Sequence, residues 1–254
     1  MVKNVLVIMA MTAEAAPLIA RLSLTKSTTT TLCSTINFAL PYESYEGTFN
    51  ETTITLLTSG KCGTHGVDNV GTLHAGMMTM YALRELQSAE SKYDLVVNAG
   101  TCGGFISRGC KIGSVCIPEH TSFHDRRINI PGTPFEAYGH GKITIEEGHM
   151  ATSVRSYFSY LGGGVTTGDS LDHTKEDMEI MKKHSSTVKD MEAAAISQVC
   201  KLAGVEYLGV KVVTDLIDGD RPAHEEFMEN LGKAAESLQE NVPKIIEYLA
   251  NKSD

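Results

Sequence analysis

Short runs of apolar, mostly β-branched residues recur along the chain and predict buried strands. The runs are apolar on both sides of the strand alternation, as expected for parallel strands that are covered on both faces. The predicted strands cover residues 4–9, 53–57, 95–97, 114–117 and 207–213. Segments with helical spacing or helix-forming composition lie between them, at residues 63–86, 147–160, 174–183, 191–203 and 222–250. This alternation predicts a layered α/β fold with helices on both faces of the sheet.

The last of these helices has a clear start signal. Pro222 is favoured in a first helical turn, and Glu225 and Glu226 come next, where acidic side chains complement the helix dipole. Pro243 lies inside the same segment, and we expect it to kink the helix or to divide it in two. The stretch from residue 23 to 44 has no clear period, which indicates a surface connection or an irregular strand.

Length and composition indicate one globular domain over residues 1–254. A chain of 254 residues can bury a sizeable core, and no linker divides it. Its 42% hydrophobic and 21% charged residues are ordinary for a globular protein. The net charge of −9 argues against a nucleic acid or an anionic membrane as partner, so a small polar ligand is the better expectation.

The cysteines and the first residues bear on location. The six cysteines form no C-x-x-C pair, and the chain is larger than the usual disulfide-stapled secreted domain, so we expect reduced thiols in a cytoplasmic protein. Residues 1–16 loosely resemble a signal peptide, but their apolar run is short, and Glu14 and Pro17 interrupt the segment after it. A buried strand at residues 2–9 that leads into a helix is the better interpretation. No apolar stretch approaches the roughly 20 residues of a membrane span.

Two carboxylates stand in segments that otherwise exclude charge. Glu192 lies at the start of an Ala-rich helix, and Asp215 follows an apolar strand. Desolvation raises the pKa of a carboxyl group and can make it a proton donor at neutral pH, so the pair indicates acid/base chemistry. Glu14 follows the first strand at the same edge of the sheet, and in isolation a glutamate stabilised by the helix dipole is the simpler interpretation. If Glu14 points inward instead, three carboxylates surround one cleft and suit cleavage through a cationic, oxocarbenium-like transition state.

Other polar segments give weaker signals. The glycine-containing segment 98–105 follows a strand, at the edge where open α/β sheets bind ligands, but it matches neither a Walker loop nor a dinucleotide-binding loop. The segment 166–172 is expected to form a turn, with an aspartate that caps the helix from Thr174. The acidic segment 215–220 lacks the spacing of a calcium loop, and His120 and His124 lack the helical context of a zinc site. We therefore predict no metal site and no cofactor.

Six segments carry a family resemblance when they are taken together and in order. They are Ala-Met-Thr-Ala-Glu at 10–14, Asn-Ala-Gly-Thr-Cys-Gly-Gly-Phe at 98–105, His-Asp-Arg-Arg-Ile at 124–128, Thr-Gly-Asp-Ser-Leu-Asp at 167–172, Asp-Met-Glu-Ala-Ala-Ala at 190–195 and Val-Thr-Asp-Leu-Ile-Asp-Gly-Asp-Arg-Pro at 213–222. This set resembles the 5'-methylthioadenosine nucleosidases, most closely those of plants. The resemblance implies a nucleoside-phosphorylase-like, three-layer αβα sandwich around a twisted mixed sheet. It also implies a homodimer and cofactor-free hydrolysis of 5'-methylthioadenosine to adenine and 5-methylthioribose.

The resemblance also implies residue roles. Asp215 would protonate the purine at N7, Glu14 would activate the attacking water, and Glu192 would hold the ribose hydroxyls. The other implied substrate-binding residues are Met11, Thr101, Cys102, Gly103, Leu171, Asp172, Met191 and Lys211. In this family a loop of the partner subunit closes the 5'-alkylthio end, and residues 128–134 are the candidate here. The implied residues of the 5' pocket are Ile130, Pro131, His224 and Phe227.

One departure from the family pattern affects the water site. Bacterial members have an arginine four residues before the catalytic aspartate, where this chain has Lys211. A lysine is a point donor that cannot form a bidentate fork, so the water is expected to be held differently. The sequence leaves open whether S-adenosylhomocysteine is also a substrate.

The sequence leaves two alternatives to a hydrolase. A phosphorylase on the same scaffold would need cations for its phosphate, and arginines are few, although Lys61 stands in the first loop. A non-catalytic nucleoside-binding or storage protein would be recognised by loss of a catalytic carboxylate, and all three candidates are present.

Overall fold

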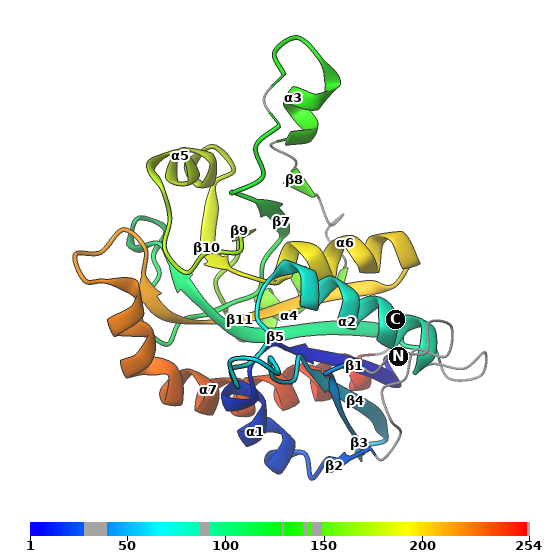
Figure 1. The fold of residues 1–254 in the computed structure, drawn as a ribbon. Helices are drawn as coiled ribbons and strands as arrows, with labels where there is room; N and C mark the ends of the chain where they lie inside the picture. The colour runs from blue at the N-terminus through cyan, green and yellow to red at the C-terminus, as the bar shows by residue number, and fades with distance from the viewer. Residues whose placement is uncertain (28–39, 87–91, 129, 140–141, 144–148, 253–254) are drawn as a thin grey trace.

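The computed structural model describes residues 1–27, 40–86, 92–128, 130–139, 142–143 and 149–252 (Figure 1). Within these residues the strands are β1 (Asn4–Met9), β2 (Thr25–Lys26), β3 (Glu43–Phe49), β4 (Thr52–Thr58), β5 (Leu95–Gly104), β6 (Val115–Cys116), β7 (His120–Phe123), β8 (Lys142–Ile143), β9 (Gly164–Thr167), β10 (Ser186–Asp190) and β11 (Glu206–Leu216). The helices are α1 (Thr12–Arg21), α2 (Thr72–Glu85), α3 (Pro134–Gly139), α4 (His149–Phe158), α5 (Lys175–Lys183), α6 (Ala193–Ala203) and α7 (Ala223–Asn251), with a short 3₁₀ turn at Ile106–Arg108.

The strands form one mixed sheet with β5 at its centre. β1 and β11 both pair with β5 in parallel, and β4 pairs in parallel with the other side of β1. The end of β5 also pairs with β10 in antiparallel fashion, and β10 leads to β9 and β7. Because β1, β5 and β11 are parallel, their carboxyl ends meet at one edge of the sheet.

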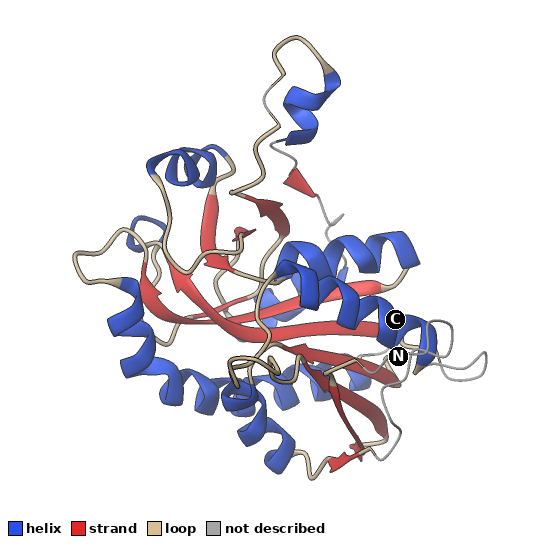
Figure 2. Cartoon of the chain, in the orientation of Figure 1, coloured by secondary structure: helices blue, strands red, loops and turns tan. Residues whose placement is uncertain are grey.

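Helices cover both faces of the sheet (Figure 2). On one face α1, α4 and α7 pack over a core that includes Leu18, Val154 and Leu238. On the other face α2 and α6 pack together over a second core that includes Met78 and Ile196. The expected three-layer αβα sandwich around a mixed sheet is therefore confirmed.

The predicted strands and helices are present, and several of their boundaries differ. The strand predicted at 95–97 continues through the glycine segment to Gly104. Pairing with β1, β10 and β11 supplies partners for this extended backbone. The helix predicted from residue 63 begins only at Thr72, after a turn-rich loop in which Gly66 and Gly71 have positive φ angles.

Of the two outcomes expected for Pro243, a kink or a division of the last helix, the division is wrong. α7 runs from Ala223 to Asn251 without a break, and Pro222 stands just before it as the N-cap. A proline inside a helix costs about 3 kcal/mol. Here Val242, Ile245 and Ile246 beside it are buried in the core, and that packing keeps the helix whole.

Several strands lack an apolar run and were not predicted, among them β3, β7 and β10. A surface connection or an irregular strand is expected for the segment 23–44. Residues 28–39 of this segment lie outside the described residues. Among the described helices none is long and apolar enough to cross a membrane.

Candidate active site

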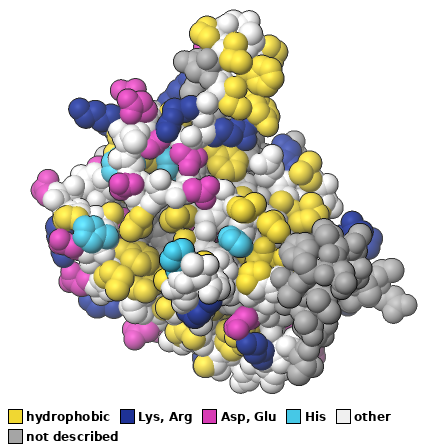
Figure 3. Space-filling view, viewed as in Figure 1, with side chains coloured by type: hydrophobic (Ala, Val, Ile, Leu, Met, Phe, Trp, Pro, Cys, Tyr) yellow, Lys and Arg dark blue, Asp and Glu magenta, His cyan; other side chains and the backbone are white. Residues whose placement is uncertain are grey.

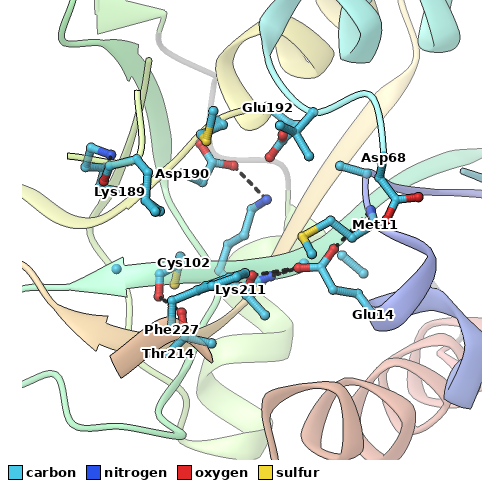
Figure 4. Close-up of a pocket in the computed structure, with 18 of the residues that line it drawn as sticks. Met11, Glu14, Asp68, Cys102, Lys189, Asp190, Glu192, Lys211, Thr214 and Phe227 are labelled. Atoms are coloured by element: carbon cyan, nitrogen blue, oxygen red, sulfur yellow. Dashed lines mark hydrogen bonds and ion pairs between the residues drawn. The ribbon is translucent and has the colours of Figure 1, made fainter. Parts of the chain in front are cut away.

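A cavity of about 530 Å³ opens at the carboxyl ends of β1, β5 and β11 (Figure 4). Glu14, Glu192 and Asp215 all line it, although they come from three different parts of the chain. The inward alternative for Glu14 is therefore the one observed, and the convergence expected from the sheet topology is present.

Glu14 is held as a hydrogen-bond acceptor in the first turn of α1. Its Oε1 accepts bonds from the Thr101 backbone N–H at 2.7 Å and the Thr101 hydroxyl at 2.6 Å. Its Oε2 lies 3.3 Å from the Met11 backbone nitrogen, which donates to it across the helix start. Burial raises the pKa of Glu14, while these donors and the charge of Lys211 oppose that rise. The surrounding groups thus favour a carboxylate, which is the form that a base requires.

Asp215 lies where β11 departs from regular pairing. The register with β5 shifts between Val213 and Asp215, and such a bulge redirects a side chain. The Thr214 hydroxyl donates to Asp215 Oδ1 at 2.8 Å. Burial raises the pKa of Asp215, and the nearby Glu226 carboxylate acts in the same direction. A carboxyl group with a raised pKa is suited to donating a proton.

Glu192 stands as the N-cap residue of α6, but its side chain does not cap the helix. Asp190 and Thr167 accept the first helical N–H groups instead, from Ala193 and Ala194, both at 2.9 Å. Glu192 is free to face the cavity, where its Oε1 accepts the Gly71 N–H at 2.9 Å. Burial and the neighbouring Asp190 charge raise the pKa of Glu192 to about 7.

Lys211 extends from the middle of β11 toward Asp190, with Glu192 and Glu14 nearby (Figure 4). Its Nζ lies 2.7 Å from Asp190 Oδ2, and both side chains are 1% exposed. Burial alone would lower the pKa of Lys211, but the Asp190 and Glu192 charges raise it above its ordinary value. Lys211 is therefore a fixed cation beside the two glutamates.

Gly103 is required by the position of Asp215. A Cβ atom at this residue would lie 2.7 Å from Asp215 Oδ2 and 2.9 Å from Ile217. Distances that short force the neighbours to move, so the glycine segment makes room for the aspartate. The lack of a side chain at Gly103 leaves room for the Asp215 carboxyl group, while the Gly103 backbone is part of β5.

Most of the sequence-predicted binding residues line the cavity. They are Met11, Thr101, Cys102, Gly103, Leu171, Met191, Lys211 and Phe227. Asp172 and His224 are not among its described lining residues, and both have exposed side chains. Asp172 follows Leu171, which faces inward, and His224 lies three residues before Phe227 on α7. In each case a nearby apolar residue lines the cavity, and the binding roles expected for Asp172 and His224 stay predictions.

Ile130 and Pro131 also lie away from this chain's own cavity. They are exposed and lead into α3, which projects from the body of the molecule (Figure 1). Asn129, within the candidate loop 128–134, lies outside the described residues. Arg126 donates to the Tyr138 carbonyl at 2.7 Å and stacks on its ring at 4.2 Å, which ties the projecting segment to the end of β7.

The cavity is also lined by residues to which the sequence gave no role, namely Asp68, Val70, Lys189 and Asp190. Lys61, the cation considered for a phosphate, lines it as well. A lysine inside an apolar strand, such as Lys211, requires a buried acidic partner. This requirement is the sequence signal by which a residue such as Asp190 could have been found. Asp68 gave no such signal, because the Thr12 hydroxyl that donates to it at 2.7 Å is 56 residues away.

The remaining polar segments have structural partners. Thr174 itself caps α5, so the expected aspartate cap from the segment 166–172 is wrong. Asp169 instead accepts the Thr72 N–H and hydroxyl at the start of α2. Arg127 pairs with Asp177. In the described residues no cluster of His, Cys, Asp and Glu could hold a metal ion. Burial raises the pKa of Cys102 well above its ordinary value, so it lines the cavity as a neutral thiol.

Comparisons with known proteins agree with this arrangement. Residues 4–247 match the family model described as the phosphorylase superfamily. The chain is 34% identical over 252 residues to a 5'-methylthioadenosine nucleosidase of Arabidopsis thaliana, covering 99% of this chain and 89% of that protein. It is 34% identical to a 5'-methylthioadenosine/S-adenosylhomocysteine nucleosidase of the same plant, covering 99% and 93%. The solved structure of an Arabidopsis thaliana 5'-methylthioadenosine nucleosidase superposes with a TM-score of 0.90 over 99% of this chain and 98% of that one, at 34% identity.

Proposed function

The chain belongs to the phosphorylase superfamily, and from that premise we propose that it is a nucleosidase that hydrolyses the N-glycosidic bond of 5'-methylthioadenosine. The products are adenine and 5-methylthioribose. The observation that carries the proposal is the convergence of Glu14, Glu192 and Asp215 on one cavity, each in different surroundings.

The surroundings of the three carboxylates support a division of roles. Asp215, whose pKa is raised by burial, donates a proton to purine N7 as the glycosidic bond breaks. Glu14, which accepts bonds at both oxygens, takes a proton from the attacking water. Glu192, which lines the same cavity, accepts hydrogen bonds from the ribose hydroxyls, and its carboxylate stabilises the cationic sugar. Met191 packs against the sugar, and Leu171 lies along the base.

The cations of the cavity favour water over phosphate as the nucleophile. Among the described lining residues the cations are Lys61, Lys189 and Lys211, with no arginine. Lys211 pairs with Asp190 at 2.7 Å, and Lys189 donates to two backbone carbonyls. Lys61 is exposed and lies 3.7 Å from Asp68. A phosphate dianion would have to displace these acceptors, whereas water requires no free cation.

Adenine release is the test of the proposal. Purified protein is incubated with 5'-methylthioadenosine and, separately, with S-adenosylhomocysteine, each with and without phosphate. We expect release that needs no phosphate and yields a reducing sugar. Release that depends on phosphate and yields a sugar 1-phosphate would establish a phosphorylase. Binding without turnover would identify a storage protein. The S-adenosylhomocysteine arm measures the tolerance for a long 5' substituent.

We further propose that the active form is a cytoplasmic homodimer. Ile130, Phe135 and Tyr138 are 47%, 53% and 56% exposed on the projecting α3 segment, where apolar side chains gather (Figure 3). Leu73, Met77 and Met80 form an exposed apolar face on α2. Burial of these surfaces between two copies would bring Ile130 and Pro131 to the open 5' end of the partner's cavity. Light scattering after size exclusion measures the mass, and a monomer with full activity contradicts this arrangement.

A further inference from the structure

Lys189 holds a short segment that forms part of the cavity wall. It is a buried residue of β10 and is not one of the three carboxylates or their direct partners. Its Nζ donates to the Ser170 carbonyl at 2.6 Å and to the Leu171 carbonyl at 3.0 Å. Leu171 and Lys189 both line the cavity, so the ammonium group fixes the backbone of a neighbouring part of the wall.

The neighbouring residues of the segment are held by other groups. The Gly168 N–H donates to the Asp190 carbonyl at 3.2 Å, and the Asp169 N–H donates to Asp125 Oδ2 at 2.8 Å. Asp169 in turn accepts two bonds from Thr72. These contacts fix the beginning of the segment, whereas the two Lys189 bonds act at its tip.

Lys189 also lies across β5 from the candidate acid. Gly103 of β5 is the register partner of Lys189 on one side and of Asp215 on the other. Burial lowers the pKa of Lys189, while the carboxylates of Asp215, Asp190, Asp172 and Asp125 oppose that fall. Conversely, the charge of Lys189 lowers the pKa of Asp215, against burial and the charge of Glu226 on α7.

We propose that Lys189 is a positioning residue for the purine side of the cavity. Its hydrogen bonds hold the backbone of Ser170 and Leu171 in place along the base, and its charge keeps the proton affinity of Asp215 within a working range. This inference rests on the proposed nucleosidase function and adds a residue to it. Lys189 acts through Leu171 and Asp215 and takes no part in bond breaking.

Three substitutions separate the hydrogen-bonding role of Lys189 from the role of its charge. Lys189→Arg keeps the donors and the charge, Lys189→Gln keeps a donor and removes the charge, and Lys189→Met removes both. We expect Lys189→Met to raise the KM for 5'-methylthioadenosine about tenfold, the change expected for losing hydrogen bonds to a charged group, with a smaller change for Gln. The exposed Lys182→Met is the matched control and should leave KM unchanged.

The pH dependence of kcat/KM tests the role of the Lys189 charge, because a loss of packing alone does not shift it. The acid must be protonated to act, so activity falls as the pH rises through the pKa of Asp215. Removing the Lys189 charge raises that pKa, so the alkaline limb of kcat/KM should move upward by about half a pH unit or more in Gln and Met, but not in Arg. The acidic limb, set by the base, should stay in place.

The outcomes distinguish the two proposals. A wild-type protein that releases no adenine refutes the nucleosidase function itself. A wild-type protein that is active, with Gln and Arg variants that share its alkaline limb, refutes the role of Lys189. The Gln and Arg pair decides the matter even if Lys189→Met does not fold.

Discussion

Lys211 and Asp190 form an ion pair in which Lys211 Nζ lies 2.7 Å from Asp190 Oδ2 and both side chains are 1% exposed. Asp190 also accepts the Ala193 N–H and the Thr167 hydroxyl, so one carboxylate joins β9, β11 and the start of α6. The pair sets the position of a cation between the glutamates of the cavity. It also makes the site part of the structural core.

Lys211→Met should be strongly destabilising. The substitution leaves the Asp190 charge buried without its cation, which typically costs about 3–5 kcal/mol in the free energy of unfolding. Urea denaturation measures the change. The double variant Lys211→Met/Asp190→Asn should recover part of the loss, because the unpaired charge is removed. The exposed Lys201→Met serves as control, and a cost for Lys211→Met no greater than that of the control contradicts the prediction.

Asp215→Asn should greatly slow turnover and preserve binding. The amide cannot supply an acidic proton to the purine, and loss of general acid catalysis typically lowers kcat by about 100-fold to 10 000-fold. Asparagine has nearly the same size as aspartate, so the affinity for a non-hydrolysed analogue, measured by calorimetry, should stay close to that of the wild type. The exposed Asp220→Asn provides the comparison at the same strand end. Wild-type kcat in Asp215→Asn would remove this residue from the acid role.

The architecture and the convergence of carboxylates follow from local patterns in the sequence. Apolar runs identify β1, β4, β5 and β11, and parallel strands bring their carboxyl ends to one edge. For this reason Glu14 and Asp215, which follow or end such strands, could be placed near each other without a structure. Their chemical roles required the family resemblance, since both are simply carboxylates in apolar surroundings.

Other parts could not be predicted because distant partners determine them. All five residues of β10 (Ser186–Asp190) are buried, yet most are polar and the segment has no apolar run. Lys189 and Asp190 are tolerated there because Leu171 and Lys211, far along the chain, satisfy them. Similarly, spacing alone does not decide that Leu171 faces the cavity while Asp172 faces solvent. Those directions depend on tertiary contacts.

The active-site carboxyls should make stability depend on pH. Burial raises the pKa of Glu192 from the ordinary 4.5 to about 7, so the unfolded chain ionises first as the pH rises. The stabilisation that comes from the neutral form is present below pH 4.5 and is lost between pH 4.5 and about 7. Glu14 and Asp215, whose pKa values burial also raises, act in the same direction.

Glu192→Gln isolates this effect, because glutamine stays neutral. Between about pH 4.5 and pH 7.5 the wild type should lose on the order of 2 kcal/mol more unfolding free energy than the variant. Thermal melts in parallel buffers measure the difference in Tm. The exposed Glu236→Gln should match the wild type at every pH. Parallel pH curves for wild type and Glu192→Gln would show that Glu192 ionises normally.

Gly103→Ala should impair catalysis more than folding. A Cβ atom at this position would lie 2.7 Å from Asp215 Oδ2 and 2.9 Å from Ile217 Cγ1, so the aspartate must shift. A displacement of about 1 Å at a reacting group can cost about 100-fold in rate, and we expect kcat to fall by that order. Gly63→Ala is the matched control, since a Cβ atom there meets nothing within 4 Å. The two variants are compared by kcat and by circular dichroism melts. If Gly103→Ala retains the kcat of Gly63→Ala, the position of Asp215 tolerates the shift, and its geometry is less demanding than an acid aimed at a single purine nitrogen requires.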